Sequence, residues 1–197
     1  MVMCAFEGGG AQRDMVLLCN ALLAQGVRLT ILVLRNEGSL RSLLDPGIRV
    51  IPVSGQRLRH AIPGLRRAIR AIVPRLVVSS EAGLNLCSLV EVRLLPRADR
   101  PKLVLREVGT PSIAQRHDPH RQNRFAYRIL RHFYRYADHI ITLTEGARRD
   151  LAQNFSVPER MISVMRANAV ARNGGSDRRV GRRKAAASRI SSAASDA

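Results

Sequence analysis

The chain has 197 residues, of which 46% are hydrophobic, and its 33 Lys and Arg against 15 Asp and Glu give a formal net charge of +18. The length suits one domain, and this many apolar residues exclude disorder throughout. Cys4, Cys19 and Cys87 lie far apart without C-x-x-C spacing, so a disulfide scaffold is excluded and reduced thiols are expected.

Short apolar runs alternate with helical patterns over the first 165 residues. Strands are predicted over 2–6, 28–34, 48–53, 76–79, 103–106, 140–143 and 161–164, and helices over 11–25, 40–44, 61–73, 83–95, 120–137 and 146–154. Repeated units of this kind require parallel strands covered by helices. The predicted fold class is therefore α/β, with a parallel sheet and helices on both faces.

The most apolar stretch, residues 15–34, is interrupted by Asn20, Gln25, Gly26 and Arg28. It therefore predicts a helix, a turn and a strand rather than a membrane span. The first residues also lack the pattern of a secretory signal peptide, so we expect a cytoplasmic protein.

The end of the chain differs from the rest, because Arg, Ala and Ser dominate residues 171–197 and no apolar period remains. Residues 166–197 hold eight basic and two acidic residues, so +6 of the net +18 falls there and +12 on the first 165 residues. We expect a disordered basic tail. It is explained either as a nucleic-acid arm or as translation in a shifted reading frame.

A glycine-rich loop, Gly8–Gly10, separates the first predicted strand from the first helix. This layout exposes backbone N–H groups and a helix N-terminus to an anion. It matches neither G-x-G-x-x-G nor a Walker P-loop, which excludes a dinucleotide oxidoreductase and an NTPase. A tight turn without a ligand is the alternative.

The run from Gly8 to Leu34, GGGAQRDMVLLCNALLAQGVRLTILVL, resembles the opening of family 4 retaining glycosyltransferases, with their Gly-Gly-Ala-Glu/Gln-Arg loop. Four further segments agree with that family in order and spacing, namely residues 47–51, 75–79, 137–146 (ADHIITLTEG) and 157–164 with Asn168. The resemblance covers residues 1–170 and favours the shifted frame as the origin of the tail. It implies a Rossmann-like domain that forms the N-terminal, acceptor-holding half of a GT-B enzyme.

The resemblance further implies transfer of a sugar from a nucleotide-sugar donor to a glycan or lipid-linked acceptor, with retention of configuration. In that family the donor site, with its paired glutamates, belongs to the C-terminal half. We expect that half to be missing or to be a separate partner, so the chain is a truncated, frameshifted or split enzyme that is inactive alone. No cofactor is expected, since the nucleotide sugar needs the C-terminal domain.

Ligand contacts are expected from loops that follow the strands, because open α/β sheets bind ligands there. Many relatives carry a His after the fifth strand, whereas Val108 and Gly109 follow Glu107 in this chain, which leaves Glu107 as the expected contact with an acceptor hydroxyl. Thr144 and Glu145 have a structural alternative as the cap and first turn of a helix. The expected contacts to the acceptor or donor diphosphate are Gly9, Gly10, Arg13, Glu107, Thr110, Glu145 and Arg148.

Two predicted helices carry arginine stripes, and the longer stripe extends over about 21 Å. The side opposite that stripe holds Phe125, Ile129, Leu130 and Phe133. Each stripe is either a solvated helix face or a surface that attaches to anionic lipid headgroups. An excess of Arg over Lys is also typical of GC-rich coding. The arginines expected at a membrane surface are Arg121, Arg124, Arg128, Arg131, Arg135, Arg66, Arg67 and Arg70.

A second function class is a non-catalytic, basic nucleic-acid-binding protein, which the sequence pI of about 11.6 favours. Only 4% of the residues are aromatic and no known nucleic-acid motif is present, so nucleic acid is not the expected partner. No metal site is expected, because the five histidines have no Cys or carboxylate at ligand spacing. The expected location is the cytoplasm, with peripheral attachment at the inner membrane face.

Overall fold

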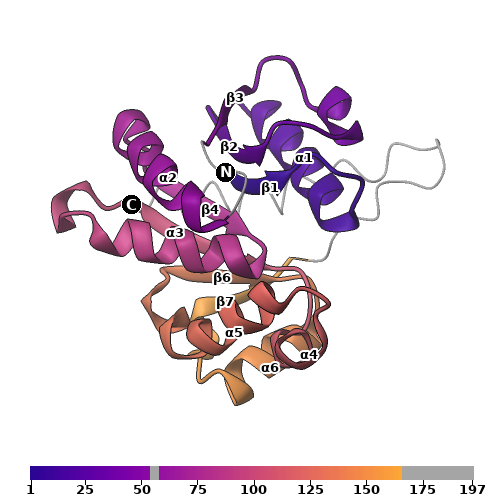
Figure 1. Cartoon of the computed structure of the whole chain (residues 1–197), viewed down its shortest axis with the longest axis vertical. Coiled ribbons are helices and arrows are strands. Elements are labelled where there is room, and N and C mark those ends of the chain that lie inside the picture. Colours follow the sequence, from indigo (N-terminus) through magenta and orange to yellow (C-terminus); the bar gives the residue numbers. More distant parts are fainter. Residues whose placement is uncertain (54–57, 166–197) are drawn as a thin grey trace.

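The computed structural model describes residues 1–53 and 58–165 (Figure 1). Seven strands form one parallel sheet in the order β3-β2-β1-β4-β5-β6-β7. The strands are β1 (Val2–Ala5), β2 (Thr30–Arg35), β3 (Arg49–Pro52), β4 (Leu76–Ser80), β5 (Lys102–Glu107), β6 (His139–Thr142) and β7 (Ile162–Val164). The helices are α1 (Gly10–Leu23), α2 (Leu58–Ile72), α3 (Ala82–Leu94), α4 (Pro111–His117), α5 (Arg121–Phe133) and α6 (Glu145–Asn154), with short 3-10 helices η1 (Ser39–Leu43), η2 (Arg97–Asp99), η3 (Tyr134–Tyr136) and η4 (Glu159–Met161).

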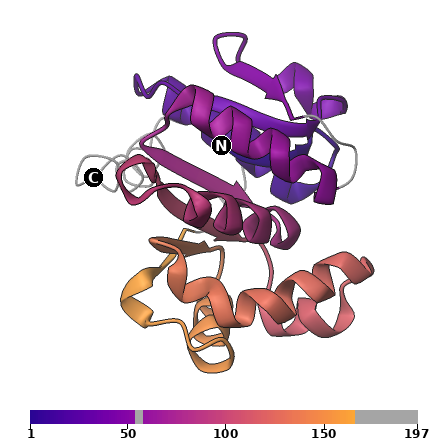
Figure 2. The same cartoon turned by 60° about the vertical axis from the view of Figure 1, so that its left-hand side comes forward.

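The direction of strand addition reverses between β1 and β4. The chain adds β2 and β3 on one side of β1, returns through α2, and then adds β4 to β7 on the other side. Because connections between parallel strands are right-handed, this reversal puts helices on both faces of the sheet. The predicted α/β class with a parallel sheet is confirmed (Figure 2).

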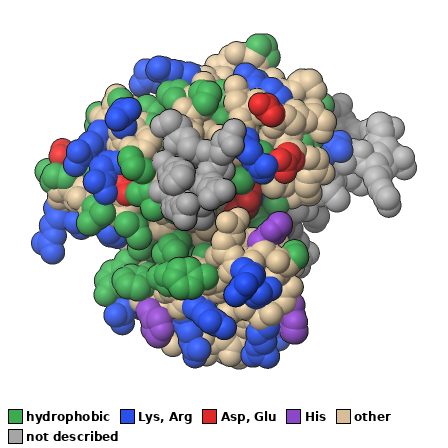
Figure 3. All heavy atoms as spheres, in the orientation of Figure 1, with side chains coloured by type: hydrophobic (Ala, Val, Ile, Leu, Met, Phe, Trp, Pro, Cys, Tyr) green, Lys and Arg blue, Asp and Glu red, His purple; other side chains and the backbone are tan. Residues whose placement is uncertain are grey.

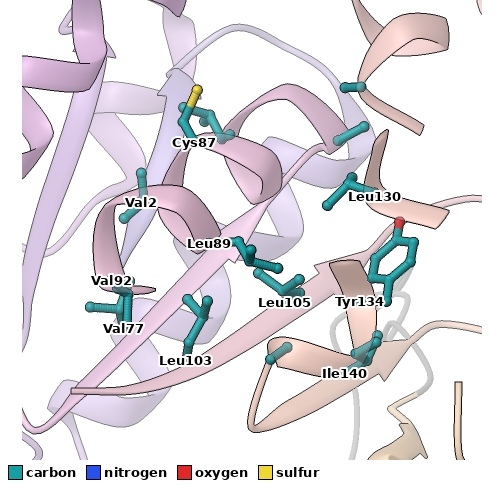
Figure 4. Close-up of a cluster of buried hydrophobic side chains, with 14 of the residues drawn as sticks. Val2, Val77, Cys87, Leu89, Val92, Leu103, Leu105, Leu130, Tyr134 and Ile140 are labelled. Atoms are coloured by element: carbon teal, nitrogen blue, oxygen red, sulfur yellow. The ribbon is translucent and has the colours of Figure 1, made fainter. Parts of the chain in front are cut away.

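The larger core lies between the sheet and the layer of α2, α3, α5 and α6. Leu103 and Leu105 of β5 and Ile140 of β6 point into this layer, where they join Leu89 of α3 and Leu130 of α5 (Figure 4). Alternate residues of a strand face the same side, which is why Leu103 and Leu105 share this core.

A smaller core lies on the other face, under α1. Met15 and Cys19 of α1 are buried against Met3 of β1 and Ile31 and Val33 of β2. The spacing of the two α1 residues, one turn apart, puts them on the same side of the helix. Each face of the sheet thus has its own apolar cluster.

Helix α5 is shorter and turned differently from the prediction. It ends at Phe133 and continues as the 3-10 helix η3. Phe125 is 63% exposed and Phe133 is 42% exposed, so the prediction that both lie on the packed side is wrong. The side that packs holds Ala126, Tyr127, Leu130 and Tyr134. These residues recur every three or four positions, which satisfies the period of a buried helix face without the two phenylalanines.

Other local differences are small. The predicted helix over 40–44 is the 3-10 helix η1, and the short helix α4 was not predicted. The predicted tail, residues 171–197, lies outside the described residues. In the described part of the chain, no helix combines the length and apolar character that crossing a membrane requires.

Candidate functional site

The carboxyl ends of all seven strands meet at one edge of the sheet, which we call the carboxyl edge. Open α/β sheets bind ligands outside this edge, at the point where the strand order reverses. That point lies between β1 and β4, so the loop Gly8–Gly10 and the residue Glu81 flank it. The segments that follow β5 and β6 bring Thr110, Glu145 and Arg148 to the same edge.

The glycine loop leaves the start of α1 open. Gly10 is exposed, and a Cβ at this position would meet no atom within 4 Å. Gly9 has an ordinary φ of −73°, and a Cβ added there would overlap only the flexible side chain of Gln12, which would have to move. Neither backbone conformation nor packing against a rigid neighbour therefore requires these glycines. They leave free space above the first N–H groups of α1, where the helix dipole favours an anion.

Arg13 lies in the first turn of α1, and its side chain is exposed. It comes one turn after Gly9, whose carbonyl accepts the Arg13 backbone N–H at 3.0 Å. The structure therefore brings Gly9, Gly10 and Arg13, three of the contacts that the resemblance implied, to the same end of α1 at the carboxyl edge.

Glu81 also lies at the carboxyl edge, although no sequence pattern indicated it. It follows β4 with φ of 80° and ψ of 135°, a conformation that side chains rarely adopt and that costs about 1–3 kcal/mol. Its Oε1 accepts a 3.2 Å hydrogen bond from Nε2 of Gln12, which joins the segments after β1 and β4. Burial raises the pKa of the Glu81 carboxyl. Strained residues of this kind concentrate at functional sites.

Glu107, the expected acceptor contact, is 1% exposed and does not face the solvent. Its Oε1 accepts hydrogen bonds from Nδ2 of Asn85 at 2.8 Å and from the hydroxyl of Tyr134 at 2.7 Å, and its Oε2 accepts one from the hydroxyl of Tyr127 at 3.0 Å. Burial raises the pKa of Glu107, although all three hydrogen bonds oppose that shift. The side chain thus joins β5 to α3, α5 and η3 instead of reaching the carboxyl edge.

Arg106 precedes Glu107 and points to the opposite face, because neighbouring side chains of a strand alternate. Its guanidinium is fully buried and pairs with Asp14 of α1. Within the part of the chain that the structure describes, Nε and Nη1 of Arg106 have no acceptor. Desolvation lowers the pKa of this guanidinium, and the Asp14 carboxylate partly offsets that effect.

The residues after β6 show the capping that was their structural alternative. Thr144 Oγ1 accepts the backbone N–H of Ala147 at 3.1 Å, which confirms Thr144 as the N-cap of α6. Arg148 donates to Glu145 at 2.5 Å and to Glu159 at 2.6 Å, so the two predicted contact residues of α6 pair with each other. Thr110 precedes α4 and makes no capping hydrogen bond through its side chain.

Within residues 1–53 and 58–165, no group of three His, Cys, Asp or Glu side chains is placed so that it could hold a metal ion. The carboxyl edge presents the open N-terminus of α1, the exposed Arg13 and the partly exposed Glu81.

A comparison with protein families matches residues 9–167 to the family described as glycosyl transferase 4-like domain. This chain belongs to that family. The match runs from the glycine loop to β7 and includes every described strand except β1, so the resemblance predicted from the sequence motifs is confirmed. No curated protein matches the sequence significantly.

Solved structures share the fold of this glycosyl transferase 4-like domain. Anabaena HepE, solved with UDP, superposes with a TM-score of 0.59 at 12% identity, over 84% of this chain and 43% of its own. WaaG, a glycosyltransferase of lipopolysaccharide biosynthesis, gives 0.56 at 12% identity, over 83% and 43%. UDP-N-acetylglucosamine 2-epimerase from Rickettsia bellii gives 0.56 at 16% identity, over 82% and 43%. The glycosyl transferase 4-like chain therefore spans less than half the length of each of these proteins.

Proposed function

We propose that this chain forms the acceptor-binding half of a glycosyltransferase that moves a sugar from a nucleotide-sugar donor to a glycan or lipid-linked acceptor. The observation that carries the proposal is the open glycine loop, which faces the strained Glu81 across the point where the strand order reverses. Family membership supplies the reaction class. The fold alone would not, because one structural neighbour is an epimerase.

In this proposal the contact with an acceptor hydroxyl comes from Glu81 rather than from the buried Glu107. The Glu81 side chain is partly exposed at the carboxyl edge, and Gln12 holds it by one hydrogen bond. Arg13 and the N-terminus of α1 lie beside it and favour negative charge, such as a phosphate of the donor or of a lipid-linked acceptor.

We further propose that the chain transfers no sugar alone. The groups that stabilise the leaving diphosphate supply much of the electrostatic catalysis in such transfers. The proposal assigns those groups to the second half of a GT-B enzyme, and the structural neighbours are more than twice as long as the matched region.

The direct test uses the purified 197-residue chain on a glycan array and in an assay for nucleoside diphosphate release from a panel of nucleotide sugars. We expect saturable glycan binding that Arg13→Ala and Glu81→Ala weaken about tenfold, without diphosphate release above background. Arg75→Ala is the matched control, because Arg75 is exposed at the opposite edge of the sheet. Absence of glycan binding would contradict the acceptor role, and diphosphate release would contradict the assignment of the donor groups.

The helical face over α2, α3 and α5 supports a second part of the proposal, attachment to an anionic membrane surface. Val90 and Leu94 of α3 and Phe133 and Tyr136 beside them are exposed, and Figure 3 shows such apolar side chains in a band between groups of basic ones. Phe125 is exposed on α5 between Arg121 and Arg128, which are one turn away on either side. Apolar side chains flanked by arginines are typical of helices that lie on lipid headgroups.

The arginines of this face are not equivalent. Arg67, Arg70, Arg121 and Arg128 are exposed, whereas Arg66 binds Glu91 of α3 through a contact of 2.5 Å. Arg124 is half-buried and donates to the carbonyl of Asp118 at 2.7 Å. We therefore propose that Arg66 and Arg124 have a structural role and that the exposed arginines make the lipid contacts.

Vesicle flotation tests this attachment. We expect the chain to bind phosphatidylcholine vesicles that contain phosphatidylglycerol, and expect Arg121→Gln/Arg128→Gln to weaken binding roughly tenfold or more, at about 1 kcal/mol for each arginine. The matched control is Arg28→Gln/Arg49→Gln, which removes the same charge from exposed positions elsewhere. If both double variants lost vesicle binding equally, net charge alone would explain the attachment. Salt-sensitive DNA retention that survives deletion of residues 171–197 would instead favour a nucleic-acid-binding protein.

A further inference from the structure

A pocket of about 360 Å³ lies near the amino ends of the strands, at the end of the sheet opposite the carboxyl edge. Its lining consists of Arg131, His132, Arg135, Phe155 and Ser156. Helices α5 and α6 both run back from the carboxyl edge, so the end of α5 and the residues after α6 meet where β6 and β7 begin. The pocket is therefore separate from the proposed acceptor site.

Two of the five lining residues are arginines and a third is a histidine, and none of the three is paired with an acid in the described part of the chain. In residues 1–53 and 58–165 no carboxylate lies within ion-pair distance of Arg131, His132 or Arg135. The only described contact of the Arg135 guanidinium is with Tyr136, by a 3.2 Å hydrogen bond to its hydroxyl and by packing over its ring. The lining therefore carries uncompensated donors.

The acidic side chains of the neighbouring elements are engaged elsewhere. Asp150 of α6 accepts the backbone N–H of Ser112 at 2.8 Å and Nδ2 of Asn154 at 2.7 Å. Glu159 of η4 pairs with Arg148. Neither carboxylate is thus available to neutralise the pocket.

The C-terminal end of α5 explains how these donors can lie together without a carboxylate partner among the described residues. Arg131 and His132 lie in the last turn of α5, where the helix dipole is negative and stabilises cations. Arg135 follows one turn later in η3, so its side chain lies near that of Arg131. The fold itself therefore holds two guanidinium groups and an imidazole around one opening.

We propose that this pocket binds a phosphomonoester, the chemistry shared by a phosphorylated small molecule and a phosphatidic acid headgroup. A phosphomonoester carries nearly two negative charges and three terminal oxygens. The forks of Arg131 and Arg135 each match two such oxygens, and the His132 ring and the Ser156 hydroxyl supply further donors.

The size and the lining of the pocket agree with this ligand class. Its volume lies at the lower end of the range of small-molecule sites, and it accommodates a phosphate together with the group that the phosphate esterifies. Phe155 forms an apolar wall, and Ser156 has a positive φ of 52°, a conformation that is uncommon for serine and that fixes the rim. A bare carboxylate would use fewer of these donors.

The first experiment measures binding of inorganic phosphate to the full chain by calorimetry at fixed ionic strength. We expect a saturable site whose affinity falls at least tenfold in Arg131→Gln/Arg135→Gln and also falls in His132→Gln, whereas Arg13→Ala leaves it unchanged. The matched control is Arg75→Gln/Arg97→Gln, which removes two exposed arginines near the same edge of the sheet and should leave affinity within twofold. Circular dichroism melting verifies that each variant folds.

A second experiment distinguishes a lipid headgroup from a soluble phosphomonoester as the ligand. Vesicles with phosphatidic acid present a monoester, whereas phosphatidylglycerol presents a diester in the same bilayer. Preference for phosphatidic acid that disappears in Arg131→Gln/Arg135→Gln identifies a lipid headgroup as the ligand. Phosphate binding without this preference identifies a soluble phosphomonoester. Failure of wild type to bind phosphate, or equal loss in both double variants, overturns the proposal and leaves the glycan-binding test unaffected.

Discussion

Glu107 shows how one buried carboxyl organises its surroundings. Asn85, Tyr127 and Tyr134 come from α3, α5 and η3 and all donate to it. Because each of these donors is buried, removing the acceptor leaves them without a partner in a site that excludes water. Glu107 is therefore a structural residue next to the loop that leads to Thr110.

We expect Glu107→Leu to destabilise the fold by about 1–3 kcal/mol for each donor that loses its partner. Glu107→Gln keeps one carbonyl acceptor and should cost less. The midpoints of thermal unfolding of both variants and of wild type measure the difference. Equal midpoints for Glu107→Leu and wild type would show that the buried network does not contribute to stability.

The pH dependence of stability tests the same site. Burial raises the folded-state pKa of Glu107 above the ordinary value of 4.5, so the protonated form fits the fold better. Its contribution to stability is complete below the unfolded pKa and is lost as pH rises through the folded pKa. Between pH 4.5 and pH 8, we expect wild type to lose thermal stability relative to Glu107→Gln. A midpoint difference that does not change with pH would argue against a raised pKa.

Glu81 offers a test of backbone strain. Glu81→Gly and Glu81→Ala remove the same carboxylate, but only glycine relieves the positive φ of 80°. We expect Glu81→Gly to be more stable than Glu81→Ala by about 1 kcal/mol or more. Both variants should lose glycan binding equally. Equal unfolding midpoints of the two variants would contradict strain at this position.

At the scale of elements, the sequence predicted strands better than helix orientation. The apolar runs around Ile31 and Val104 predicted β2 and β5 because parallel strands are buried on both faces. The short helix α4 was missed, because its seven residues, Pro111 to His117, show no clear helical period. Helix α5 was predicted with Phe125 inside, since the sequence alone does not show which of two apolar stripes meets the sheet.

The candidate site was predicted where it depends on a single loop. The glycine loop and the Thr144 cap are local features, so their residue types were sufficient. The burial of Glu107 depends on side chains at least 20 positions away, and the strain at Glu81 depends on how β4 meets α3. Neither leaves a local pattern in the sequence.

The contact between α2 and α3 gives a test at this scale. Glu91 is 1% exposed, and Arg66 donates to both of its carboxylate oxygens. Arg66→Ala would leave that carboxylate buried without its partner, whereas Arg67 is exposed on the same helix. We expect Arg66→Ala to lower the midpoint of thermal unfolding and Arg67→Ala to leave it nearly unchanged. Similar midpoints would show that the pair does not hold the two helices together.

At the scale of the whole molecule, the two proposed sites lie at opposite ends of the strands of one sheet. The strands fix the distance between the glycine loop and the phosphomonoester pocket, because both are attached to the ends of paired strands. The chain can therefore engage a phosphate group and a glycan at the same time without competition. We expect saturating phosphate to leave glycan affinity unchanged, and a shift in that affinity would reveal coupling.

The all-parallel sheet also has a kinetic consequence. Each pair of neighbouring strands is joined through a segment that contains a helix or a long loop. The partners Val2 of β1 and Ser79 of β4 are more than 70 residues apart in the sequence. Such non-local pairing raises the entropic cost of the folding transition state. Refolding of this chain should therefore be slow for its size, and its unpaired strands should aggregate before the central pair forms.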